Sequence, residues 1–181
     1  MKKLFLFAGL PGVGKSSISR EVSKKTGAKI VDIDDFKKID VDPTLLKNQI
    51  DPPELRWAYY QKALEYVFGL FDQGISTVIM DEVFHLNSLR TQLEYLCAER
   101  HVQVLWVEVQ CPYDIVERRL QSTTREGHIL SAEEALKMHL LFKGIFEKFS
   151  IHSQNHIIVN NKKDTNMDLL VGSILKILKI S

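Results

Sequence analysis

The sequence predicts an α/β domain of three layers, in which helices cover both faces of a parallel β-sheet. Short apolar runs alternate along the chain with longer segments of helical periodicity, as expected for parallel strands joined by right-handed crossovers. Residues 77–80 (Thr-Val-Ile-Met) are almost continuously apolar, which indicates a strand covered on both faces. A glycine-rich loop lies between the first apolar run and the first helical segment.

Five segments have the features of strands. The first is an unbroken apolar run, and the other four are short and rich in β-branched or aromatic side chains. The predicted strands are residues 4–7, 29–33, 77–80, 102–109 and 156–159.

Helical patterns separate these strands. Long helices are predicted over residues 53–72, 86–100 and 132–149. Ser131 and Glu134 have the spacing of a capping box, which would start the third of them. A closing helix has one apolar face, formed by Leu170, Val171, Ile174, Leu175 and Leu178.

Composition excludes several functional classes. The 181 residues suit one domain with a sizeable core, and we expect residues 1–181 to form a single domain. A formal charge of +1 predicts no strong attraction to nucleic acid or membrane. No stretch approaches the ~18 apolar residues of a membrane span. Cys97 and Cys111 lack metal-ligand spacing and fit buried thiols of a reducing cytosol, so we expect a cytoplasmic protein without a membrane partner.

Residues 9–16 spell a complete phosphate-binding loop, G-x-x-x-x-G-K-[ST], between the first strand and a helix. Its glycines let backbone N–H groups point at phosphate oxygens. Lys15 would reach the β- and γ-phosphates, and the Ser16 hydroxyl would complete a Mg²⁺ shell. The predicted nucleotide-binding residues are Gly9, Gly12, Val13, Gly14, Lys15, Ser16 and Ser17. The loop predicts a protein that binds a nucleoside triphosphate.

Three carboxylates follow the second predicted strand, at the sheet edge where such folds bind ligands. A kinase needs a group near the γ-phosphate that takes the proton of the attacking hydroxyl. In an extended chain Asp32 and Asp34 share one side, and Asp35 points away unless the strand has already ended. We expect Asp34 to be this catalytic group. The alternative is a solvated acidic turn that caps the next helix.

The third predicted strand ends in the acidic pair Asp81 and Glu82, which has the form of a Walker B element. Asp81 is expected to hold Mg²⁺ together with Ser16, directly or through water. Glu82 has two possible roles: it could polarise water in an ATPase, or it could lie in the substrate site.

Arginines gather after the fourth predicted strand. A short helical lid over approximately residues 118–131 would close on the triphosphate and exclude water. Arg125 is the expected catalytic arginine, and Arg118 or Arg119 could instead form structural ion pairs. A solvated helix end is the alternative interpretation of this segment.

These residues together resemble the P-loop small kinases of the nucleoside-monophosphate-kinase-like fold, and most closely the AAA-type predicted kinases, which include phage-type polynucleotide 5′-hydroxyl kinases. The resemblance rests on residues 9–17, the turn Asp34-Asp35-Phe36, residues 74–84 and 107–112, and Arg119-Leu120 with Arg125. It implies a P-loop NTPase with a five-stranded parallel sheet in the order 2-3-1-4-5. It also implies that Asp34 activates the acceptor hydroxyl.

Two residues depart from the family pattern. Lys37 stands where polynucleotide kinases have a substrate-binding arginine, so a nucleic-acid acceptor is possible but not favoured. Glu82 stands where relatives usually have a small residue, which predicts a different acceptor pocket. Residues 36–60 should shape much of that pocket. Within them Arg56 could grip an anionic group and Trp57 or Tyr60 could stack on a ring, although aromatics at this helical spacing are more often core.

The function predicted from these observations is an ATP-dependent kinase. With ATP and Mg²⁺ it would move the γ-phosphate to a hydroxyl of a small molecule or of a 5′-hydroxyl nucleic acid. Two alternatives remain. One is an ATP-hydrolysing or ATP-binding regulator with Glu82 as the base. The other is a GTP-binding protein using Asn161-Lys162-Lys163-Asp164, although residues 81–84 lack the D-x-x-G switch pattern and Asp164 or Thr165 could simply cap the closing helix.

Overall fold

The computed structural model describes residues 1–40, 50–122, 131–149, 155–162 and 166–177. Its five strands form one sheet in the order β2-β3-β1-β4-β5, and every neighbouring pair is parallel. This confirms the predicted sheet and its strand order. The strands are β1 Lys2–Ala8, β2 Lys29–Asp32, β3 Thr77–Asp81, β4 Val102–Gln110 and β5 His156–Asn160.

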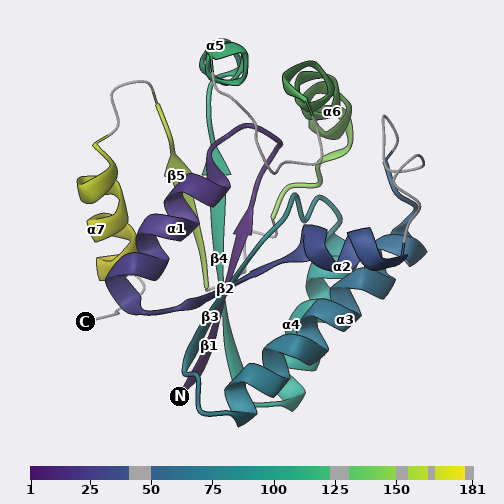
Figure 1. Cartoon of the computed structure of the whole chain (residues 1–181), viewed down its shortest axis with the longest axis vertical. Coiled ribbons are helices and arrows are strands. Elements are labelled where there is room, and N and C mark those ends of the chain that lie inside the picture. The colour runs from purple at the N-terminus through teal and green to yellow at the C-terminus, as the bar shows by residue number, and fades with distance from the viewer. Residues whose placement is uncertain (41–49, 123–130, 150–154, 163–165, 178–181) are drawn as a thin grey trace.

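Helices cover both faces of the sheet, as Figure 1 shows: α1 and α7 lie on one side, and α3 and α4 lie on the other. α5 and α6 lie near the carboxyl ends of the strands (Figure 1). The helices are α1 Lys15–Thr26, α2 Ile33–Asp40, α3 Pro53–Asp72, α4 Asn87–Glu99, α5 Tyr113–Ser122, α6 Ala132–Ile145 and α7 Met167–Ile177. Over the described residues, none of these helices combines the length and apolarity needed to cross a bilayer.

The central strand β1 supplies side chains to two separate cores. Leu4 and Leu6 pack into the cluster formed with α3 and α4, whereas Phe5 and Phe7 pack into the cluster formed with α1, α5 and α7. All four side chains are fully buried. Because side chains alternate along a strand, this two-sided burial explains why the strand reads as a continuous apolar run.

The helix predicted over residues 132–149 is shorter in the structure, because α6 ends at Ile145. The buried guanidinium of Arg90 donates hydrogen bonds to the carbonyls of Glu147 (2.7 Å) and Lys148 (3.2 Å). It also lies 4.1 Å from the centre of the Phe149 ring. These contacts hold residues 146–149 outside the helix, so a tertiary interaction overrides local helical propensity.

Replacing Arg90 should therefore destabilise the fold. An Arg90→Met protein loses the donors to three main-chain carbonyls, including that of Phe84, and we expect a loss of about 2–4 kcal/mol in the free energy of unfolding. The measurement is urea denaturation. The matched control is Arg100→Met, since Arg100 is exposed and should cost less than about 1 kcal/mol. Equal urea midpoints for the two variants would contradict the inferred role of Arg90 in holding residues 146–149.

Candidate active site

The phosphate loop curls at positions where only glycine fits. Gly14 has φ 95° and precedes the first residue of α1. A Cβ atom there would lie 2.3 Å from Asn161 Nδ2, and one on Gly9 would lie 2.4 Å from the Val109 carbonyl oxygen. Asn161 Nδ2 donates to the Val13 carbonyl (2.9 Å), so the segment after β5 stabilises the conformation of the loop.

The end of the loop and the start of α1 carry hydrogen-bond donors suited to an anion. The Lys15 ammonium donates to the carbonyls of Gly9 (2.9 Å) and Leu10 (3.2 Å) and thus lies across the loop. The hydrogen bond from Ile18 N–H to the Gly14 carbonyl is the first of α1. The N–H groups of residues 15–17 therefore have no acceptor within the helix, and such an N-terminus favours an anion.

The two predicted metal ligands lie beside each other. Ser16 Oγ is 3.5 Å from Asp81 Oδ1, and the buried Ser19 hydroxyl donates to Asp81 Oδ2 (3.2 Å). Ser19 was not predicted from the sequence, although it lies one helical turn after Ser16. A hydroxyl and a carboxylate fit Mg²⁺, which takes oxygen ligands and keeps much of its shell for water and phosphate.

The acidic turn after β2 differs from the extended geometry considered for it. β2 ends at Asp32 and α2 begins at Ile33, so strand alternation does not relate Asp32, Asp34 and Asp35. Asp32 Oδ1 accepts a hydrogen bond from the Asp34 N–H (2.9 Å), which is the capping role of the alternative interpretation. Asp34 is half-buried, Asp35 is exposed, and Asp32 pairs in register with Asp81 on β3.

Glu82 belongs to a buried charged network. Arg56 on α3 donates to Glu82 Oε1 (2.6 Å), and its other terminal nitrogen lies 3.7 Å from Asp51 Oδ2. The same Asp51 oxygen accepts from the Lys37 ammonium (2.6 Å) and from the Tyr59 hydroxyl (2.9 Å). Asp51 was missed from the sequence because these partners are brought to it only by folding. The network lies at the end of β3, next to Asp81.

The aromatic residues of α3 belong mainly to the core. Tyr60, Leu64 and Val67 are fully or almost fully buried in the cluster beneath α3 and α4, and Trp57 packs against it. This confirms the interpretation of the helical spacing as core packing.

Polar groups next to Glu82 are buried with unused hydrogen-bonding capacity. In the described part of the chain, Arg56 Nε, the Tyr60 hydroxyl and His85 Nδ1 make no hydrogen bond. Burial, with a further contribution from nearby Arg56, lowers the pKa of His85 from 6.5 to about 4. Phe142 of α6 packs against His85 and Arg56. Its ring centre lies 4.9 Å from that of His85 and 5.3 Å from the Arg56 guanidinium.

α6 also contacts the phosphate loop. The buried His139 ring donates from Nδ1 to the Pro11 carbonyl (2.8 Å). Burial lowers the pKa of His139. The hydrogen bond to Pro11 acts in the opposite direction, and Lys143 and Lys15 add to the lowering. No local sequence signal marks this residue, because the contact joins positions that are far apart in the chain.

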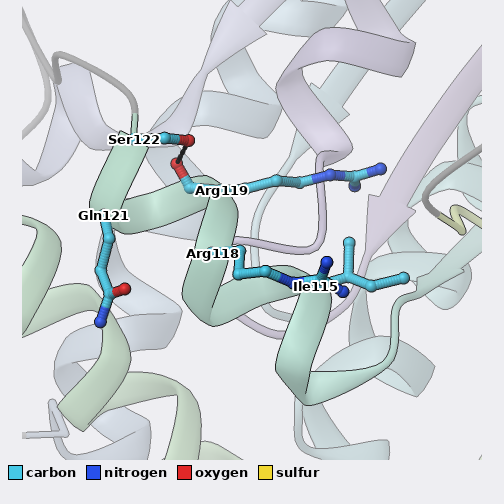
Figure 2. Close-up of a pocket in the computed structure, with 5 residues that line it drawn as sticks. All are labelled: Ile115, Arg118, Arg119, Gln121 and Ser122. Carbon is cyan, nitrogen blue, oxygen red and sulfur yellow. Dashed lines mark hydrogen bonds between the residues drawn. The ribbon is translucent and has the colours of Figure 1, made fainter.

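α5 carries two of the arginines that were assigned to a lid. Arg118 forms an exposed ion pair with Asp114 (2.8 Å), which confirms the structural alternative for it. Arg119 donates to the carbonyl of Lys162 (3.0 Å). Figure 2 shows Arg119 extended away from the other residues lining a shallow pocket on α5, which are Ile115, Arg118, Gln121 and Ser122. Residues 123–130, including Arg125, lie outside the described residues, so the lid and the role of Arg125 stay predictions.

The N-K-x-D motif is described only in part. The Asn161 side chain is buried and donates to the phosphate loop, while Lys163, Asp164 and Thr165 lie outside the described residues. The guanine-binding hypothesis therefore stays untested.

A parallel sheet in the order β2-β3-β1-β4-β5, with this loop between β1 and α1, defines a P-loop NTPase. A protein-family model described as an AAA domain matches residues 4–142, and the chain belongs to this family. An uncharacterized protein of Mycobacterium tuberculosis is 27% identical over 140 residues, which cover 74% of this chain and 28% of that protein. The chain thus spans little more than a quarter of the length of that relative.

Solved structures share the fold. A sugar kinase from Janibacter sp. superposes with a TM-score of 0.74 at 21% identity, covering 100% of this chain and 96% of that one. A gluconokinase from Sinorhizobium meliloti gives 0.66 at 14% identity and covers 98% and 91%. The Mycobacterium tuberculosis APS kinase in complex with AMPPNP and APS gives 0.65 at 18% identity and covers 98% of both chains. This chain has the fold of P-loop kinases.

The lowered pKa of His85 predicts a pH dependence of stability. Between pH of about 6.5 and about 4 the unfolded chain binds a proton at His85 that the folded protein does not, so stability falls as the pH falls. His85→Leu should flatten this slope, measured by urea denaturation across the window. The control is His101→Asn, since His101 is exposed and asparagine tolerates its φ of 55°. Equal slopes in wild type and His85→Leu would contradict the prediction.

Proposed function

We propose that this protein is an ATP-dependent kinase that transfers the γ-phosphate to an alcohol group of a small molecule. The observation that carries the proposal is the placement of Asp34 and Glu82 at the sheet edge that also holds Lys15, Ser16 and Asp81. A phosphate loop alone would serve any nucleoside triphosphatase, whereas carboxylates at the same edge suit a hydroxyl acceptor. The structural neighbours, a sugar kinase, a gluconokinase and an APS kinase, support the same reaction class.

The chain's own residues would divide the work as follows. Residues 9–17 hold the phosphates through backbone N–H groups and the Lys15 ammonium. Ser16 and Asp81 hold Mg²⁺, which supplies charge neutralisation at the β- and γ-phosphates when bound. Arg125, assigned from the sequence alone, would stabilise charge on the transferring group.

In the transfer step the acceptor oxygen bonds to the γ-phosphorus while the bond from that phosphorus to the β-phosphate oxygen breaks. The hydroxyl proton passes to the Asp34 carboxylate, and the products are ADP and a phosphate monoester. The half-buried position of Asp34 in the first turn of α2 supports its choice over the exposed Asp35.

Hydrolysis of ATP with Glu82 as the base is less well supported. The Arg56 guanidinium donates directly to Glu82 Oε1 (2.6 Å), so one of the two carboxylate oxygens is already occupied. A basal hydrolysis rate that every acceptor leaves unchanged would favour the hydrolytic function over the kinase.

Lys15→Ala should weaken ATP binding by about 10–100-fold, because it removes charge-assisted hydrogen bonds to the phosphates. Isothermal titration with Mg·ATP measures the change. Lys24→Ala is the matched control, since Lys24 is an exposed lysine of α1 that forms an ion pair with Glu21 (2.6 Å). Unchanged affinity in a folded Lys15→Ala protein would reject the nucleotide site.

Asp34→Asn should leave Mg·ATP affinity nearly intact but slow phosphoryl transfer by roughly two to four orders of magnitude, the effect of a positioned acid–base group. Asp35→Asn should change turnover much less. Acceptor-dependent ADP release is measured for both variants after a folding check. Loss of turnover in Asp35→Asn with normal turnover in Asp34→Asn would reverse the assignment at this turn.

A further inference from the structure

We infer that the acceptor is an uncharged polyhydroxy compound, of the sugar or polyol type, and that the Glu82 carboxylate binds its hydroxyls. This inference rests on the proposed kinase function and names the substrate class for it. It also assigns a role to Arg56, which holds Glu82 in place and does not bind an anionic substrate.

The backbone places Glu82 at the phosphate loop. Its N–H donates to the Phe7 carbonyl (3.1 Å), and the N–H of Gly9, the first loop residue, donates to the Val83 carbonyl (3.3 Å). Glu82 also follows the predicted Mg²⁺ ligand Asp81 directly. An acceptor next to the γ-phosphate would therefore lie within reach of this side chain.

The Arg56 side chain is buried, and its guanidinium is already paired with Glu82. The side chain is 3% exposed, it bonds to Glu82 Oε1 at 2.6 Å, and Phe142 packs against the guanidinium. Its Nε atom is also buried, so an incoming carboxylate or phosphate cannot reach it without displacing Glu82. A guanidinium in this setting positions its carboxylate partner, since breaking a buried pair leaves an uncompensated charge.

The remaining charges near Glu82 do not favour an anion. Lys37 is held by Asp51 at 2.6 Å, so the two cations Lys37 and Arg56 are matched by the two carboxylates Asp51 and Glu82. His85 is neutral at physiological pH because its pKa is lowered to about 4. Within the described residues this network therefore carries no net positive charge to attract a phosphate or carboxylate.

Glu82 keeps capacity for a neutral ligand. Its side chain is 17% exposed, and Arg56 occupies Oε1. The second oxygen, Oε2, accepts no hydrogen bond from the described part of the chain. A carboxylate is an acceptor only, so it matches ligands that present O–H donors, and polyols present several of them.

The test compares three acceptor classes with the full chain and Mg·ATP: uncharged sugars and polyols, sugar acids, and sugar phosphates. ADP release is measured together with product mass, which identifies the phosphorylated compound. We expect the best uncharged acceptor to exceed the best anionic one in kcat/KM by at least about tenfold. Preference for an anionic acceptor overturns the inference but supports the kinase. Failure of every acceptor to form a phosphorylated product overturns the proposed function, and the inference with it.

The Glu82→Gln substitution removes the charge of the side chain but keeps its size, so it tests whether the carboxylate itself binds the acceptor. It should lower kcat/KM for uncharged acceptors by about 10–100-fold and narrow the preference over sugar acids, with Mg·ATP affinity changed less than about threefold. Glu94→Gln is the matched control, because Glu94 lies on α4 and accepts a hydrogen bond from Trp106 of β4 (2.6 Å), outside the network of Glu82. If Glu82→Gln does not fold, Glu82→Asp keeps the charge and should keep the discrimination against anions. Unchanged acceptor preference in Glu82→Gln, or loss of that discrimination in Glu82→Asp, overturns the inference.

Discussion

The pairing of β1 with β3 continues past the last ladder residues, and the rest of the site depends on it. Backbone hydrogen bonds join Glu82 to Phe7 and Gly9 to Val83, so the loop starts in a fixed relation to the end of β3. The same continuation sets Asp81 against Ser16 and Ser19. Because these bonds are between main-chain atoms, the relative positions of the phosphate-binding and carboxylate-bearing segments do not depend on flexible side chains.

The buried Arg56 connects this edge to the helical layer. A guanidinium removed from water requires close anionic partners, and it finds them in Glu82 after β3 and Asp51 before α3. Phe142 covers it from α6. One charged side chain thus sets the relative positions of a strand end, the start of α3 and α6. In the proposed acceptor site, a carboxylate held in this way would lose little conformational freedom when a ligand binds.

The fold could be predicted because it follows from local sequence patterns. The features that could not be predicted depend on contacts between residues far apart in the chain. The phosphate loop, the strands and the bounds of α3 follow from glycine spacing, apolar runs and periodicity, and α3 runs from Pro53 to Asp72 as predicted. The early end of α6 could not be predicted because it depends on Arg90, far away in the chain. Asp51, Ser19 and His139 were missed for the same reason, since their partners become neighbours only in the folded protein.

α6 touches both halves of the site within one helical turn. His139 bonds to the phosphate loop through the Pro11 carbonyl, and Phe142, three residues later, packs on the Arg56 guanidinium beside Glu82. In the proposed kinase, this one helix would contact both the nucleotide site and the acceptor site. A displacement of α6 by one ligand would then change the free energy of binding the other, and thermodynamic linkage would make that effect reciprocal.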